Sequence, residues 1–355
     1  MKRLFLIVFL TFTIALPVNA ADINNSYDEN ITGYFDQYGI DLYEIKNNPV
    51  GSIWQIIKSS IYNITYKPFK CFFKLTVILM ISSLINLFSS SETENVIKLV
   101  NIVSLIVIIA NIYDEFKVIV DNISRSFFEI KNFMVTFLPV FAGVSFASGE
   151  MITSTVYTGM FLVCVVTVAN ICINYIIPSI NIYMAIGMTS TISDIVNLKP
   201  LCEFYSKAVK TVMTVAVSVI CFVLNMQTTI TQAQDTMAVK TGKMIVTSAV
   251  PIIGSTLQGA VGSIYASMGV LKGFCGLAGI AVVISIMLPH IINLVVNWIG
   301  YYLMITISNI FQNTTAADML SVFCQVTEIM LSVSVLFIVL LLFSLSIMIK
   351  MFQGV

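Results

Sequence analysis

The chain has 355 residues, of which 58% are hydrophobic, and its 18 basic and 18 acidic side chains leave no net charge. Only 10% of the residues are charged, against roughly 25% in a typical soluble domain, so most of the chain cannot form a water-facing globular surface. The balanced charge also provides no basic field for binding nucleic acid.

The first residues have the three parts of an export signal. Residues 2–3 are basic, residues 4–16 form an apolar run too short for an ordinary span, and Pro17 ends that run. Small residues precede an expected cut after Ala20, so residues 1–20 are predicted as a cleavable signal peptide. The alternative is an uncleaved anchor. Cleavage would leave the new N-terminus outside the cytoplasm.

Residues 21–70 are expected to form an exported polar segment that leads into an amphipathic helix. The first half is acidic and resembles a loop, and from Pro49 onward isoleucines recur at helical spacing. Trp54 suits the membrane interface, and Lys58 lies on the same stretch. The pattern predicts a helix lying on the membrane surface. A short soluble helix that covers the membrane domain is the alternative.

Residues 71–355 are predicted as one multi-span membrane domain. A helix needs about 20 apolar residues to cross the hydrocarbon core, and residues 273–317 and 329–349 contain no charged side chain. The expected fold is an all-α polytopic membrane protein with about seven spans, within a range of six to nine, plus amphipathic interfacial helices. The apolar runs lie at 71–90, 96–113, 132–149, 154–177, 179–193, 208–229, 275–294, 295–312 and 329–349.

The orientation in the membrane stays open. Loops rich in lysine and arginine face the cytoplasm in most membrane proteins, and two such loops lie at 199–210 and 240–243. Three further lysines at 67–74 lie on the side that a cleaved signal would make external. Either the first apolar run is not a simple span, or the charge rule fails here.

Residues 114–131 mix charged and large apolar side chains. The apolar positions recur at helical spacing, which predicts an amphipathic helix between spans. Such a helix would lie on the membrane, pack against a partner or form a solvated hairpin.

Residues 241–279 are rich in glycine, serine and threonine, and Pro251 interrupts their early part. Backbone breaks survive in lipid only where they are buried in protein or line a water-filled cavity, and broken helices often form transport sites. Close packing between helices explains the same composition, because Gly269 and Gly273 have the G-x-x-x-G spacing. The candidate pore or helix-packing residues are Pro251, Gly254, Gly259, Gly262, Gly269, Gly273 and Gly276.

No motif in the sequence indicates an enzyme. The chain contains no H-E-x-x-H, no Walker A loop and no G-x-S-x-G elbow. The single histidine, His290, has no Cys or carboxylate close in sequence with which to hold a metal ion, so no cofactor or metal is expected. Asp194 and Asp235 lie at the edges of apolar runs, and the scarcity of acids within those runs weakens the case for a proton-driven pump.

The segment from Thr241-Gly242-Lys243 through Pro251-Ile252-Ile253-Gly254 to Leu271-Lys272 and 276–281, with the charge-poor ending after Phe311, resembles the stage III sporulation protein AE family of endospore-forming Firmicutes. The resemblance covers most of the chain. It implies a membrane subunit of a sporulation-specific channel or secretion-like complex, located in the mother-cell membrane that surrounds the forespore.

The partners that this resemblance implies are the other subunits of the complex, ATPase-like and ring-forming membrane proteins, together with a forespore membrane protein and the lipid bilayer. No nucleic-acid partner is expected. A self-sufficient permease for small solutes is the alternative function, based on the glycine-rich segment, and an assembly scaffold is a third.

Overall fold

The computed structural model describes residues 66–87, 94–192, 199–249 and 254–350, together with a few positions between 33 and 58. The expected signal peptide over residues 1–20 therefore lies outside the described residues, as does most of the expected amphipathic helix after Pro49. Pro251 lies in the gap between 249 and 254, and its structure is not described.

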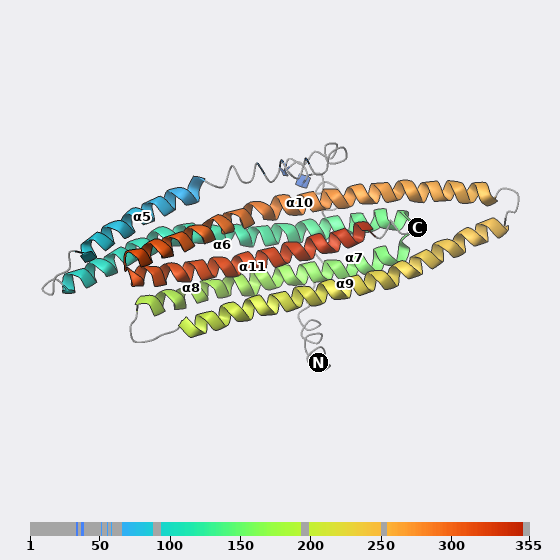
Figure 1. Cartoon of the computed structure of the whole chain (residues 1–355). Helices are drawn as coiled ribbons and strands as arrows, with labels where there is room; N and C mark the ends of the chain where they lie inside the picture. The colour runs from blue at the N-terminus through green and yellow to red at the C-terminus, as the bar shows by residue number, and fades with distance from the viewer. Residues whose placement is uncertain are drawn as a thin grey trace.

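The described residues fold into long helices that run side by side, and they contain no strand (Figure 1). Short turns connect α6 to α7 and α10 to α11, so that neighbouring helices are antiparallel. In chain order the helices are α5 (Tyr66–Leu87), α6 (Glu94–Ala147), α7 (Met151–Ile171), the π-helical turn η2 (Cys172–Ile176), α8 (Ile177–Ile192), α9 (Lys199–Ala249), α10 (Gly254–Ile310) and α11 (Thr314–Lys350).

Helix α6 joins three segments that the sequence pattern separates. Its 54 residues include the runs 96–113 and 132–147 and the charged segment 114–131 between them. At about 1.5 Å per residue such a helix is about 80 Å long, far more than one bilayer core. Within 114–131, Phe116 and Phe127 face the core while Asp114 and Arg125 are exposed. The amphipathic segment is therefore the middle of one helix and not a separate connection between spans.

Among the residues that the structure describes, four helices are long and apolar enough to cross a membrane, and the expected count of about seven spans is not confirmed. The runs 154–177 and 179–193 belong to one of these, because the chain continues from α7 through η2 into α8 without a turn. Proline has no N–H to donate to the preceding turn of a helix. The π-helical turn η2, which ends two residues before Pro178, lets the helix continue without that hydrogen bond. The runs 275–294 and 295–312 likewise form one helix that contains Pro289.

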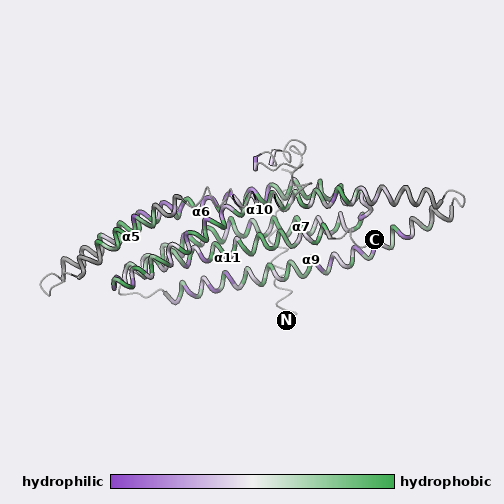
Figure 2. Tube along the Cα trace, turned by 45° about the horizontal axis from the view of Figure 1, so that its top comes forward, coloured by the Kyte–Doolittle hydropathy of each residue, from purple (hydrophilic) through white to green (hydrophobic). Residues whose placement is uncertain are grey.

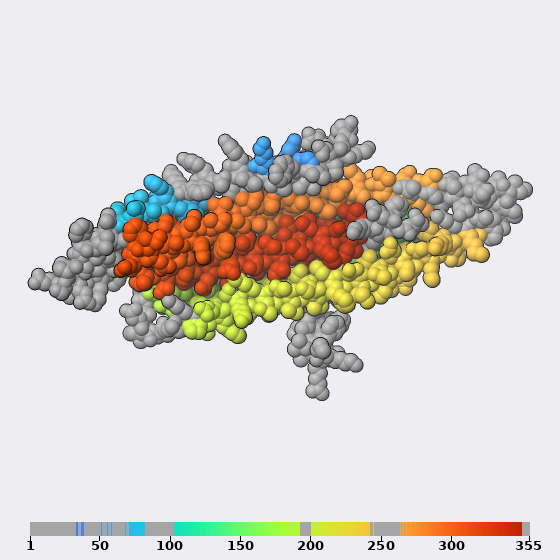
Figure 3. Space-filling model, viewed as in Figure 1, coloured from blue at the N-terminus to red at the C-terminus, as the bar shows by residue number. Residues whose placement is uncertain are grey.

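Large side chains fill the space between α6, α10 and α11. The rings of Phe116 and Phe323 lie 5.9 Å apart between centroids, and those of Phe127 and Phe337 lie 5.0 Å apart. Tyr301 of α10 is 1% exposed and contacts Phe323 of the same core. Figure 2 shows apolar residues along all the long helices. Helix α9 lies along one edge of the bundle (Figure 3), where it packs against α11, α7 and α10.

Candidate functional site

The turn between α6 and α7 depends on a glycine. Gly149 has a φ of +94°, a conformation that side chains with a Cβ rarely adopt. A Cβ at this position would also lie 3.3 Å from the ring of Tyr265 in α10. The main-chain N–H of Glu150 donates to the carbonyl of Ser145 and closes the C-terminal end of α6. Glu150 is therefore held at the N-cap position, directly before the first residue of α7.

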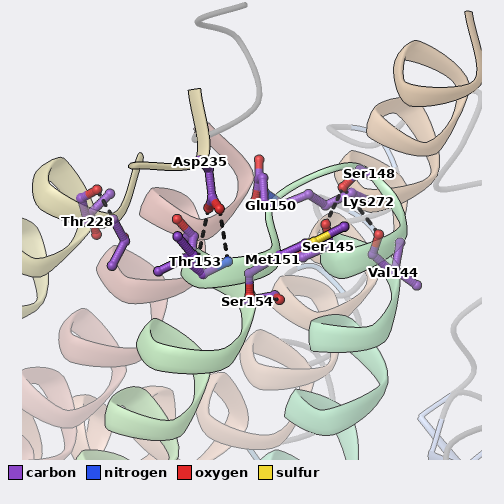
Figure 4. Close-up of polar contacts among 12 residues, drawn as sticks. Val144, Ser145, Ser148, Glu150, Met151, Thr153, Ser154, Thr228, Asp235 and Lys272 are labelled. Atoms are coloured by element: carbon purple, nitrogen blue, oxygen red, sulfur yellow. Dashed lines mark hydrogen bonds and ion pairs between the residues drawn. The ribbon is translucent and has the colours of Figure 1, made fainter. Parts of the chain in front are cut away.

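Asp235 of α9 caps the N-terminus of α7 from a different helix. Its two carboxylate oxygens each accept a hydrogen bond of 2.9 Å, one from the main-chain N–H of Ile152 and one from that of Thr153 (Figure 4). These N–H groups have no partner within their own helix, and the helix dipole places positive charge at this end. Asp235 is 5% exposed, and this capping satisfies its buried negative charge.

Lys272 of α10 forms an ion pair with Glu150 in the same place. The side chain of Lys272 is 1% exposed and that of Glu150 is 12% exposed. Burial raises the pKa of Glu150 above its usual value, the attraction of Lys272 opposes this shift, and the nearby charge of Asp235 adds to it. Figure 4 shows Asp235, Glu150 and Lys272 at the level of the α6–α7 turn. We call these three residues the buried charge cluster.

The buried charge cluster joins α7, α9 and α10 by charge pairing. Two carboxylates are balanced by one ammonium group and the positive end of α7, so each charge has a partner among the described residues. These contacts fix how far α7, α9 and α10 are shifted along their axes relative to one another. Among the described residues, no group of three His, Cys, Asp or Glu side chains is placed to hold a metal ion.

The sequence alone places Asp235 at the edge of an apolar run and does not single out Glu150. Glu150 and Lys272 are 122 residues apart in the chain, so no local pattern reveals their pairing. One signal was available. Each member of the buried charge cluster stands next to a long charge-free stretch, which is where a paired charge marks the end of a span.

The glycine-rich segment from 254 onward is a continuous helix, the first half of α10. Gly254 begins it, and Gly259 and Gly262 lie in its first turns. Gly269 is buried, and Gly273 has open space where its Cβ would be. A Cβ on Gly276 would collide with Ile349 of α11 and approach Phe141 of α6. The pore or packing role of these residues stays a prediction, and close packing is visible at Gly276.

A second group of polar contacts lies well away from the buried charge cluster. Lys210 of α9 pairs with Glu328 of α11 at 2.6 Å, with both side chains partly exposed. Lys131 of α6 donates to the side-chain oxygen of Asn170 in α7 at 3.4 Å. His290 of α10 lies within electrostatic range of charged residues in the middle of α6.

Between the buried charge cluster and this second group, five helices have stretches without a charged side chain. A stretch of 20 helical residues rises about 30 Å, which is the thickness of the hydrocarbon core. We call these stretches the apolar belt: 132–149 in and after α6, 151–171 in α7, 211–234 in α9, 273–289 in α10 and 329–349 in α11.

Exposed charges return beyond the second group. Asp114, Lys117 and Asp121 are exposed on α6, and Glu203 and Lys207 are exposed on α9. Exposed charges of this density are incompatible with lipid. The apolar belt therefore matches a bilayer in length and is bounded by exposed charges on α6 and α9, while α8 and the second half of α10 stay free of Asp, Glu, Lys and Arg beyond it.

Comparison with known proteins identifies the family. No curated protein and no solved structure matches the chain. The family model described as stage III sporulation protein AE matches residues 38–354, which is nearly the whole sequence. The match includes all the helices described above, with the buried charge cluster and the apolar belt. The chain therefore belongs to the stage III sporulation protein AE family.

Proposed function

We propose that the protein is a membrane subunit of a sporulation-specific channel or secretion-like complex between the mother cell and the forespore. Family membership makes it a sporulation protein, and its four long apolar helices indicate a membrane location. In this proposal it lies in the mother-cell membrane around the forespore and has no enzymatic activity of its own. Its partners are ATPase-like and ring-forming membrane subunits of the same complex.

The observation that supports a subunit role is the packed interior of the single chain. Phe116, Phe127, Phe161, Tyr301 and Phe337 are each less than 2% exposed. A transport path through one chain would have to pass through this core. A groove of about 420 Å³ between α6 and α7 is open to the surface and lined mainly by small and apolar residues, among them Ala142, Gly143 and Gly159. It belongs to the outside of the bundle.

The permease alternative has no support from the fold. It depended on a backbone broken by glycine and proline, and the described part of that segment is an unbroken helix from Gly254 to Ile310. A conduit that avoids the packed core must form between chains. This requirement favours a complex over a single transporter.

Purification from sporulating cells tests the proposal. The protein is tagged at its C-terminus, extracted in mild detergent and analysed by mass spectrometry, with an unrelated tagged multi-span protein as the control. We expect ring-forming and ATPase-like membrane subunits to co-purify with this chain and not with the control. Recovery of a lone chain that transports a small solute in liposomes would overturn the proposal and favour the permease.

A further inference from the structure

Two tyrosines from the N-terminal part of the chain pack against the middle of α6. The ring of Tyr34 meets the ring of Phe133 edge-on, with 5.4 Å between the centroids. The hydroxyl of Tyr38 donates to a carboxylate oxygen of Glu129 at 2.7 Å. The main-chain N–H of Tyr38 donates to the carbonyl of Tyr34 at 3.1 Å, so one helical turn presents both rings to α6. We call Tyr34 and Tyr38 the tyrosine pair.

The tyrosine pair is partly buried in this contact. Both side chains pack against the apolar core of the bundle, and Phe133 beside them is fully buried. Burial raises the pKa of the Tyr38 hydroxyl, and the hydrogen bond and charge of Glu129 raise it further. The hydroxyl therefore stays protonated at neutral pH and remains a donor. Aromatic rings with a polar tip are enriched where a membrane meets water, which fits a position at the edge of the apolar belt.

The tyrosine pair marks one edge of the apolar belt. Glu129 and Lys131 are the last charged residues of α6 before the belt, which begins at residue 132. From residue 129 the helix rises about 27 Å to its last residue, Ala147, next to the turn that holds the buried charge cluster. A hydrogen bond cannot reach across that thickness. The tyrosine pair therefore lies on the same side of the membrane as Glu129, whatever path the chain takes between them.

The expected export signal indicates which side this is. A cleaved signal peptide leaves the residues after it outside the cytoplasm, and an uncleaved anchor with the basic residues 2–3 in the cytoplasm does the same. Both alternatives place the tyrosine pair outside. The lysines beyond residue 131 do not decide the orientation by themselves, because three lie at this edge, within 199–210, and four lie at the other, at 240, 243, 272 and 350.

We infer that the tyrosine pair holds the exported part of the chain against α6, and that the bundle is oriented by this contact. The edge of the apolar belt at Glu129 faces the outside, and the buried charge cluster faces the cytoplasm. The part of α10 before Lys272, which extends past the cluster, then lies in the cytoplasm as well. The orientation goes beyond the proposed function, because a partner without an export signal can reach only the end with the buried charge cluster.

Labelling of single cysteines tests the orientation. With the full chain expressed in growing cells, the outer face of the membrane meets the medium, and a polymer-linked maleimide reaches only that face of intact protoplasts. Cysteine replaces Gln37 in the turn of the tyrosine pair, Asp121 of α6 and Ser267 of α10, all of them exposed. The native cysteines are replaced by serine or alanine, and the parent variant must still support sporulation.

We expect Gln37→Cys and Asp121→Cys to shift to higher mass in intact protoplasts and Ser267→Cys to shift only after permeabilisation. A shift of Ser267→Cys in intact protoplasts, or of Gln37→Cys only after permeabilisation, would overturn the orientation. Reaction of Gln37→Cys and Asp121→Cys from opposite sides would overturn the contact as well.

A proximity measurement tests the contact itself. A short bifunctional thiol reagent should link Tyr38→Cys to Glu129→Cys, or Tyr34→Cys to Glu129→Cys if the first double variant does not accumulate. Mass spectrometry of the digested chain identifies the linked peptides. Tyr38→Cys combined with Ser267→Cys is the control, because the apolar belt separates these positions. A link in the control, or none in either tested pair, would show that the tyrosine pair does not lie at Glu129.

Discussion

Among the charged residues that the structure describes, Lys272 is the least exposed. It lies at 1% exposure beside Glu150, and both come next to stretches that contain no other charge. Removing one member of a buried pair leaves the other charge uncompensated, which is more costly than the loss of an exposed pair. The Lys210–Glu328 pair provides the comparison, because its side chains are 28% and 46% exposed.

Replacing Lys272 with methionine tests this difference. We expect Lys272→Met to lower the free energy of unfolding by about 3–5 kcal/mol, because Glu150 stays buried without its partner. Lys210→Met, the same substitution at an exposed pair, should cost at most about 1 kcal/mol. Thermal unfolding of both purified variants in one detergent measures the difference. Equal losses would contradict the assignment of Lys272 as a buried structural charge.

Gly276 tests the packing role within the glycine-rich segment. A side chain there would meet Ile349 and Phe141, whereas the same addition at Gly273 would meet open space. We expect Gly276→Leu to lower the free energy of unfolding by about 1–3 kcal/mol through overpacking. Gly273→Leu should leave it nearly unchanged. Thermal unfolding would contradict this account if Gly273→Leu proved the more damaging of the two.

At the scale of elements, the start of α7 depends on a residue of α9. Asp235 accepts the main-chain N–H groups of Ile152 and Thr153, so losing it should loosen the first turn of α7. We expect Asp235→Ala to cost at least about 1–2 kcal/mol and to speed hydrogen exchange at Ile152 and Thr153. Thr236→Ala is the control, because that hydroxyl bonds only to its own helix, at Gln232. Unchanged exchange in Asp235→Ala would show that α7 is capped in another way.

The sequence predicts the helical class and the apolar runs but not how the runs are joined. A short apolar run looks the same whether it is a complete span or part of a longer helix. Pro178 and Pro289 both resemble breaks, yet the chain stays helical through each of them. Proline is tolerated in such helices because neighbouring helices and local π turns satisfy the freed backbone groups. Tertiary packing that a single sequence does not show therefore decides the span count.

The candidate site shows the same limit. Composition can place Glu150, Asp235 and Lys272 at the ends of charge-free stretches, but the pairing of Glu150 with Lys272 needs α10 to pack antiparallel to α6, which brings Lys272 level with the α6–α7 turn.

At the scale of the whole molecule, the bundle is longer than a bilayer is thick. The 57 residues of α10 extend about 85 Å, and one hydrocarbon core covers about 30 Å of that length. The apolar belt accounts for the covered part. Its limits are the buried charge cluster at one end and the Lys210–Glu328 pair at the other. Beyond Lys210, α6 and α9 carry exposed charges, whereas α8 and the second half of α10 contain no Asp, Glu, Lys or Arg.

The most direct test of this placement is to determine on which side of the membrane each end of α9 lies. Lys207 and Lys240 are both exposed and flank the belt, so each is replaced by cysteine and treated with a polymer-linked maleimide too large to pass a pore. We predict that one cysteine reacts in intact protoplasts and that the other reacts only after permeabilisation. Reaction of both from the same side would contradict the single crossing of α9, and with it the belt.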